Sequence, residues 1–174
     1  KEEIGNMGAT GMQSSFFEDM VAEVLALTGE DSPVKVRRAL RNSCMLSSDV
    51  SAAYDPLYPE VFEKKNTAYF GRGLVLNKYT GSRGKNGTSD ANAEYVAKVR
   101  NVFDNNHVAF QTAELGKVDQ GGGGTIAYVM ANKAMSVIDS GVAVLSMHAP
   151  YEVTSKSDVY EVYRGYKAFL KDMK

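Results

Sequence analysis

Three places in the sequence carry residue types that can bind a metal and move a proton: Glu2-Glu3, Asp49 and His148. Together they supply carboxylates and an imidazole of the kind that zinc accepts, with one carboxylate left over to act as a base. Neighbouring side chains point in different directions along an extended backbone. One glutamate of the pair can therefore ligate a metal while the other faces the metal-bound water, and this division of labour is the lead hypothesis.

Each of these residues also has a simpler explanation when it is taken alone. A Glu-Glu pair is common in solvated turns, Asp49 can end a turn or cap a helix, and His148 can be hydrogen-bonded at a strand end. The second histidine, His107, lies in no recognisable motif and is expected to be structural or exposed. Spacing by itself does not decide between a structural and a chemical role.

Length and composition predict one soluble domain. The chain has 174 residues, of which 44% are hydrophobic and 24% charged, and its net charge of -1 gives no bias toward nucleic acid or anionic membranes. The single cysteine, Cys44, has no partner for an internal disulfide, and no apolar run approaches the roughly 20 residues that span a bilayer. We expect a cytoplasmic protein. Because Lys1 is not an initiator methionine, we also expect a fragment of a longer chain.

Hydrophobic periodicity predicts alternating helices and strands, and therefore an α/β layered sandwich. A long loop is expected over residues 51–72 and a polar connection over 80–89. The first two predicted helices cover residues 14–27 and 34–41, and a third begins near Asp90. A fourth follows Gly121–Gly124 and contains Ile126, Val129, Met130 and Ala134. The last helix ends the chain and carries on one face Val159, Val162, Tyr163, Tyr166, Phe169 and Leu170. The predicted strands cover residues 44–46, 74–79, 108–111 and 142–145.

The predicted strands also position the candidate residues. Asp49 follows the first strand, and open α/β sheets bind ligands at the carboxyl ends of their strands. The glycine run Gly121–Gly124 can aim backbone N–H groups at an anion, but it lacks the Gly-Lys-Ser/Thr ending of a phosphate loop. A nucleotide site is therefore not expected.

Four segments, in order along the chain, resemble the C-terminal half of the aspartyl aminopeptidase and aminopeptidase I family: Lys1–Ala9, Ser43–Asp49, Gly123–Ile126 and Leu145–Glu152. The resemblance extends over nearly the whole chain. Its most specific part is the combination of Leu-Ser-Met-His with Ser-Cys-Met-x-Ser-x-Asp upstream.

The resemblance implies a dinuclear zinc exopeptidase that removes N-terminal residues from peptides. It implies a three-layer α/β/α sandwich of the zinc-exopeptidase type around a mostly parallel or mixed sheet. Residues 1–174 would be the C-terminal part of the catalytic domain, with its N-terminal part and an inserted second domain lying outside this chain. Family members form large homo-oligomers, commonly dodecamers. The fragment alone is expected to be inactive, because part of the metal site would be missing.

The resemblance also assigns roles. Glu2 would be the general base, Glu3 and His148 would ligate one zinc, and Asp49 would ligate the other, while a bridging Asp and a further His would come from residues before Lys1. Cobalt and manganese are alternatives to zinc that these ligands do not distinguish. Gly123 and Gly124 would let the backbone approach the substrate.

Departures from the family pattern bear on substrate choice. Where members that prefer acidic residues carry two histidines after the ligand Asp, this chain has Ala52 and Asp55. A carboxylate near the pocket repels an acidic side chain, which favours a neutral or apolar N-terminal residue. Tyr151 also stands where many relatives have Arg. Lys78 is either a pocket residue that pairs with a substrate carboxylate or an exposed lysine at a strand end.

Two other functions stay open. The first is a glutamyl or deblocking type of dinuclear zinc aminopeptidase, which shares a Glu-Glu-x-Gly pattern but not the Leu-Ser-Met-His and Ser-Cys-Met patterns. The second is a noncatalytic assembly module, since the chain by itself lacks two of the metal ligands that the family uses.

Overall fold

The main sheet has four strands in the order β1-β7-β3-β5. The computed structural model describes residues 6–78, 80–82, 89–117 and 119–173. β1 (Cys44–Ser48) runs parallel to β7 (Ser136–Gly141), β3 (Leu74–Asn77) runs parallel to β5 (Phe110–Thr112), and β3 and β7 are antiparallel. The predicted mixed sheet is therefore confirmed.

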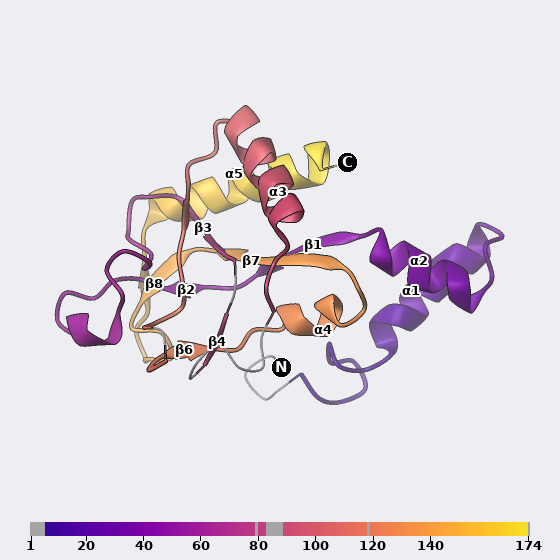
Figure 1. The fold of residues 1–174 in the computed structure, drawn as a ribbon, viewed down its shortest axis with the longest axis horizontal. Helices are drawn as coiled ribbons and strands as arrows, with labels where there is room; N and C mark the ends of the chain where they lie inside the picture. Colours follow the sequence, from indigo (N-terminus) through magenta and orange to yellow (C-terminus); the bar gives the residue numbers. More distant parts are fainter. Residues whose placement is uncertain (1–5, 79, 83–88, 118, 174) are drawn as a thin grey trace.

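Helices cover both faces of this sheet (Figure 1). Leu74, Leu76 and Ile138 pack against α3 (Ala93–Asn105) and α5 (Lys156–Asp172). Val137 points to the opposite face, where it packs with α4 (Ala127–Ala131) and α2 (Pro33–Arg41). α1 (Phe16–Leu27) contacts α2 and buries none of its residues. The three-layer α/β/α arrangement follows from the alternation of side chains along each strand.

Smaller strands extend the sheet toward the candidate site. β2 (Ser51–Ala52) follows β1 and pairs in parallel with β8 (Ala143–Leu145), which follows β7 and pairs in turn with β9 (Val153–Thr154). Beside them, β4 (Gly81–Ser82) and β6 (Gly122–Gly123) form an antiparallel pair. Within the described ranges, no helix combines the length and the apolar character that crossing a bilayer requires.

The strand β7 was not predicted from the sequence. The expected fourth helix continued to Ala134, but α4 ends at Ala131, and Ala134 has a left-handed φ of 64°. β7 carries Asp139 and Ser140 in its interior, so it shows neither an apolar run nor a strict alternation. Both polar residues are buried because β7 lies between two other strands.

The other predicted elements are confirmed with shifts of a few residues at their ends. The expected long loop contains β2 and the short 3-10 helix η2 (Pro59–Val61). The face predicted for the last helix was partly wrong. Val159, Tyr163 and Leu170 are exposed, whereas the buried residues of α5 are Asp158, Gly165 and Ala168.

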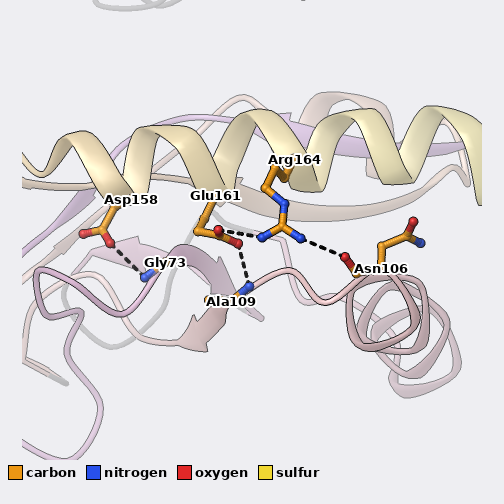
Figure 2. Close-up of polar contacts among 6 residues, drawn as sticks. All are labelled: Gly73, Asn106, Ala109, Asp158, Glu161 and Arg164. Carbon is orange, nitrogen blue, oxygen red and sulfur yellow. Dashed lines mark hydrogen bonds and ion pairs between the residues drawn. The ribbon is translucent and has the colours of Figure 1, made fainter.

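The buried carboxylate Asp158 holds the loop before β3 against α5. Its Oδ2 accepts a hydrogen bond from Gly71 N at 2.8 Å, and its Oδ1 accepts one from Gly73 N at 2.9 Å. Figure 2 shows the contact with Gly73. Asp158 is 1% exposed, so these two backbone donors take the place of water around the carboxylate.

The next turns of α5 continue this attachment (Figure 2). Glu161 accepts a hydrogen bond from Ala109 N at 2.7 Å and pairs with Arg164 at 2.8 Å. Arg164 also donates to Asn106 O at 3.1 Å. Residues spaced by three lie on one face of a helix, so α5 fastens the loop before β3, the start of β5 and the end of α3 from a single side.

Replacing Asp158 by alanine is expected to lower the free energy of unfolding by about 3 kcal/mol, because a buried charged acceptor is lost and two backbone donors lose their partner. Urea denaturation followed by circular dichroism measures the change. Asp31→Ala, at an exposed position, is the control and is expected to change stability by less than about 0.5 kcal/mol. Equal stabilities for the two variants would contradict the anchoring role of Asp158.

Candidate active site

Asp49, His148, Gly123 and Gly124 line one cavity of about 490 Å³, although they come from distant parts of the sequence. The cavity lies beside the break between β1 and β2 and beside the turn that follows β8. The described residues that line it are Asp49, Val50, Ala52, Val61, Phe62, Leu115, Gly116, Gly121, Gly122, Gly123, Gly124, Thr125, Met147, His148 and Glu152. The structure thus brings Asp49 and His148, two of the three candidate metal ligands, together with the glycine run.

Asp49 lies where the first strand is interrupted. Its backbone N–H still donates to Ser140 O at 3.2 Å, and its Oδ1 accepts a hydrogen bond from Val50 N at 2.7 Å. A Cβ atom at Gly141 would lie 1.5 Å from the Asp49 carbonyl oxygen. Only glycine allows β7 to pass so close, and this contact fixes the backbone of Asp49 at the edge of the cavity.

His148 lies in a tight turn after β8. Both Ser146 and His148 have left-handed φ values, 58° and 66°, which residues other than glycine adopt rarely. Two hydrogen bonds hold the turn: Ala149 N donates to Ser146 O at 2.9 Å, and His148 N donates to Glu152 Oε1 at 2.6 Å. Backbone strain of this kind persists only where the surroundings enforce it, and it concentrates at functional sites.

The glycine run forms one wall of the cavity. It does not open a helix directly, since Gly122 and Gly123 form β6 and α4 begins only at Ala127. Gly122 has a φ of 99°, and a Cβ there would lie 2.0 Å from Gly81 O, so β4 and β6 can pair only with glycine at this position. A Cβ at Gly124 would meet no atom of the described residues within 4 Å, so packing against these residues does not require glycine there.

The described donors fit part of a zinc site. Asp49 supplies a carboxylate and His148 an imidazole, both of which zinc accepts, whereas a zinc site needs three or four protein ligands. Among the residues that the structure describes, no group of three or more His, Cys, Asp and Glu side chains could hold a metal ion. Glu2 and Glu3 lie outside the described residues, so their roles stay predictions.

The structure places Lys78 away from this cavity. Its side chain is exposed at the end of β3 and forms an ion pair with Asp90, with 2.5 Å between Nζ and Oδ1. Lys78 is not among the residues that line the cavity. A role in substrate binding stays a prediction for this lysine.

A buried carboxylate behind the cavity was missed in the sequence. Asp139 is 3% exposed, and its Oδ2 accepts a hydrogen bond from the Thr125 hydroxyl at 3.0 Å, which ties the cavity wall to β7. Burial raises the pKa of Asp139 to about 6; the nearby hydroxyls of Ser47 and Thr125 lower it, and the charge of Asp49 raises it. The sequence does contain a signal for this buried carboxylate, because Asp139 directly follows the apolar residues Val137 and Ile138.

The raised pKa of Asp139 predicts how stability depends on pH. Between about pH 4 and pH 6 the folded chain keeps a proton that the unfolded chain releases, so the free energy of unfolding falls as pH rises, by about 3 kcal/mol in total from this group. Asp139→Asn removes this contribution. Urea titrations of both chains in EDTA at pH 4 and pH 7 measure it, and an identical pH dependence in the two chains would contradict it.

Several known proteins are similar to this chain over nearly its whole length. "Probable M18 family aminopeptidase 1" of Clostridium acetobutylicum is 62% identical over 172 residues, which are 99% of this chain and 37% of that relative. The crystal structure of an M18-family aminopeptidase from Thermotoga maritima matches 98% of this chain and 38% of its own with 44% identity and a TM-score of 0.94. The S. cerevisiae mApe1 dodecamer matches 98% of this chain and 36% of its own, with 25% identity and a TM-score of 0.75.

The α/β fold is therefore that of these aminopeptidase structures, and this chain spans somewhat more than a third of the length of these relatives. Residues 1–170 match the model of the aminopeptidase I zinc metalloprotease family, M18. The chain belongs to that family. The resemblance found in the four sequence segments is confirmed.

Proposed function

We propose that residues 1–174 form the C-terminal part of the catalytic domain of an aminopeptidase, which removes N-terminal residues from peptides at a site with two zinc ions. The observation that carries the proposal is the meeting of Asp49 and His148 in one cavity beside the glycine run, in a chain of the M18 family. The missing N-terminal part of the domain would supply a bridging Asp and a further His.

In this proposal Glu3 and His148 hold one zinc and Asp49 holds the other. When bound, the two ions polarise the scissile carbonyl and lower the pKa of the attacking water. Glu2 takes a proton from that water and delivers it to the leaving amine, which requires that Glu2 itself binds no metal. The hydrogen bond from His148 N to Glu152 keeps the backbone of the His148 turn in place at the cavity.

Gly123 and Gly124 act in the same proposal as the surface along which the peptide backbone lies. The space beside Gly124 supports this role: no described atom occupies the space into which a side chain at this position would project. Backbone N–H and C=O groups on a glycine segment can approach a peptide closely.

The residue removed is proposed to be neutral or apolar rather than acidic. The carboxylate of Asp55, close to Ala52 in the sequence, disfavours a second negative charge nearby. The full-length protein is expected to hydrolyse Leu-p-nitroanilide with at least about tenfold higher kcat/KM than Asp-p-nitroanilide, which corresponds to about 1.4 kcal/mol. A clear preference for the Asp substrate would contradict this choice.

The full-length protein is also proposed to be a cytoplasmic homo-oligomer. The dodecameric mApe1 relative supports this assembly. So do the exposed apolar side chains of α1, namely Phe16, Met20, Val24 and Leu27. Light scattering on the full-length protein measures the mass of the assembly.

A further inference from the structure

One face of the main sheet changes from apolar to polar along its strands. Met45 on β1 and Val137 on β7 are partners in the sheet and pack in the core that includes α4. Two residues further along each strand, Ser47 and Asp139 are partners on the same face, because alternate residues of a strand share a face. Asn77 on β3 is the partner of Asp139 on its other side. The three polar residues are buried, so they form a polar cluster inside the protein.

Thr125 connects this polar cluster to the cavity. It lines the cavity and directly follows the glycine run. Its Oγ1 donates a hydrogen bond to Asp139 Oδ2 at 3.0 Å and accepts one from Ala127 N at 3.3 Å. A hydroxyl has one hydrogen and two acceptor lone pairs, so the bond from Ala127 leaves that hydrogen for the carboxylate. Thr125 therefore joins the end of the glycine run to β7 and to the first residue of α4.

The same part of β7 also holds the candidate metal ligand Asp49. Asp49 N donates to Ser140 O at 3.2 Å, and the Asp49 carbonyl oxygen lies against Gly141. Three consecutive residues of β7 thus contact the backbone of Asp49 and, through Thr125, the glycine run. The spacing between these two parts of the cavity is set at one point of the sheet.

The other end of the glycine run has a support of its own. β6 pairs with β4, and Gly121 N donates to Lys117 O at 2.8 Å. Gly124 lies between this support and Thr125. Because glycine has more backbone freedom than any other residue, a support on each side is needed to keep its backbone in one position. The hydroxyl of Thr125 supplies the second of these supports.

Burial of the Asp139 carboxylate is unfavourable in itself. The residue is 3% exposed, and no ion pair between described residues includes it. Replacing both partners of a buried hydrogen bond by apolar groups of the same shape is often nearly neutral or stabilising. Packing of the core therefore does not explain an aspartate at this position, whereas the need for an acceptor that holds Thr125 does.

We propose that Asp139 is a positioning residue of the active site, which acts through Thr125 to hold the glycine run at a fixed distance from Asp49. The inference rests on the proposed aminopeptidase function, in which the peptide backbone lies along Gly123 and Gly124. A peptide held by the glycine run presents its scissile bond to the metal site only while the two parts keep their spacing. A displacement of about 1 Å can lower a rate by about 100-fold.

The test compares two conservative substitutions of Thr125 in the full-length protein. Thr125→Val keeps the shape and removes the hydroxyl, whereas Thr125→Ser keeps the hydroxyl. The kcat/KM values are measured for Leu-p-nitroanilide and for the tetrapeptide Leu-Gly-Gly-Gly, which extends further along the glycine run. Thr125→Val is expected to lower the ratio of tetrapeptide to anilide about fivefold or more, the effect of about one hydrogen bond. Thr125→Ser is expected to keep this ratio within about twofold.

The ratio of the two substrates separates positioning from folding. A smaller fraction of folded enzyme lowers both rates equally and leaves the ratio unchanged. Bound zinc, measured by elemental analysis, is expected to be equal in both Thr125 variants, because neither changes a proposed ligand. Thr67→Val is the matched control, since Thr67 is also buried but is not among the described residues that line the cavity. Its ratio is expected to equal that of the unmodified protein.

Substitutions of Asp139 test the other partner of the bond. Asp139→Asn keeps an oxygen that can accept from Thr125, whereas Asp139→Leu has a similar shape and no acceptor. The Leu variant is expected to lower the ratio as Thr125→Val does, and the Asn variant is expected to keep it within about threefold. The double variant with Thr125→Val and Asp139→Leu is expected to fall no further than the lower single variant, because both substitutions remove the same bond.

Three results would overturn the positioning role. The first is an equal ratio in the Val and Ser variants of Thr125. The second is a loss of zinc in Thr125→Val, which would show that the bond acts on the metal site rather than on the glycine run. The third is an additive effect in the double variant, which would show that the two residues act independently. An unmodified protein that hydrolyses neither substrate would instead refute the proposed aminopeptidase function, and the positioning role with it.

Discussion

His148→Ala in the full-length protein is expected to lose bound zinc and to lower kcat/KM by about 100-fold or more. His148 is proposed to ligate one of the two ions, and a metal that polarises the carbonyl contributes several kcal/mol to transition-state stabilisation. The backbone of the turn that carries His148 is held by Glu152, and His148 lines the cavity. Elemental analysis after dialysis gives the metal content, and initial rates with Leu-p-nitroanilide give the activity.

The chain contains a well-matched control for this experiment. His107, the other histidine, is also exposed and also has a left-handed φ, 52° compared with 66° for His148. The alanine substitution therefore imposes a similar backbone cost at both positions. His107→Ala is expected to keep full zinc content and activity. If both variants lost zinc equally, backbone strain rather than ligation would explain the effect of His148.

The fold was largely predictable because hydrophobic patterns along the sequence mark most of its helices and strands. α3 shows the expected period, with Tyr95, Val99, Val102 and Phe103 as its buried residues. Ser32 caps α2, and its hydroxyl accepts a hydrogen bond from Lys35 N at 3.3 Å. β7 was missed for the opposite reason. Its interior carries Asp139 and Ser140, whose polar atoms are buried through tertiary contacts that lie far away in sequence. Local patterns contain no information about such contacts.

The candidate site was predictable where short segments resemble the family. Asp49, His148 and the glycine run were singled out from the sequence, and the structure brings them into one cavity. Val61 and Phe62, which also line this cavity, were not predicted as site residues, because they lie in a segment with no periodicity and reach the cavity only through the path of the loop. The position of Lys78 at a strand end was predicted, whereas its ion pair with Asp90 was not; its role in substrate binding stays a prediction.

Glu2→Gln is the substitution expected to separate proton transfer from metal binding. In the proposed mechanism Glu2 carries a proton and binds no metal, so the variant is expected to keep its zinc and to lose about 10²- to 10⁴-fold in kcat, the usual contribution of a general base. Glu3→Gln is the adjacent control: the same chemical change one residue later should remove a ligand and lower zinc content together with activity. Because both substitutions replace a carboxylate by an amide of nearly equal size, differences in folding are minimised. Turnover that persists in zinc-loaded Glu2→Gln enzyme, or zinc loss in both variants alike, would show that the two glutamates do not divide the work in this way.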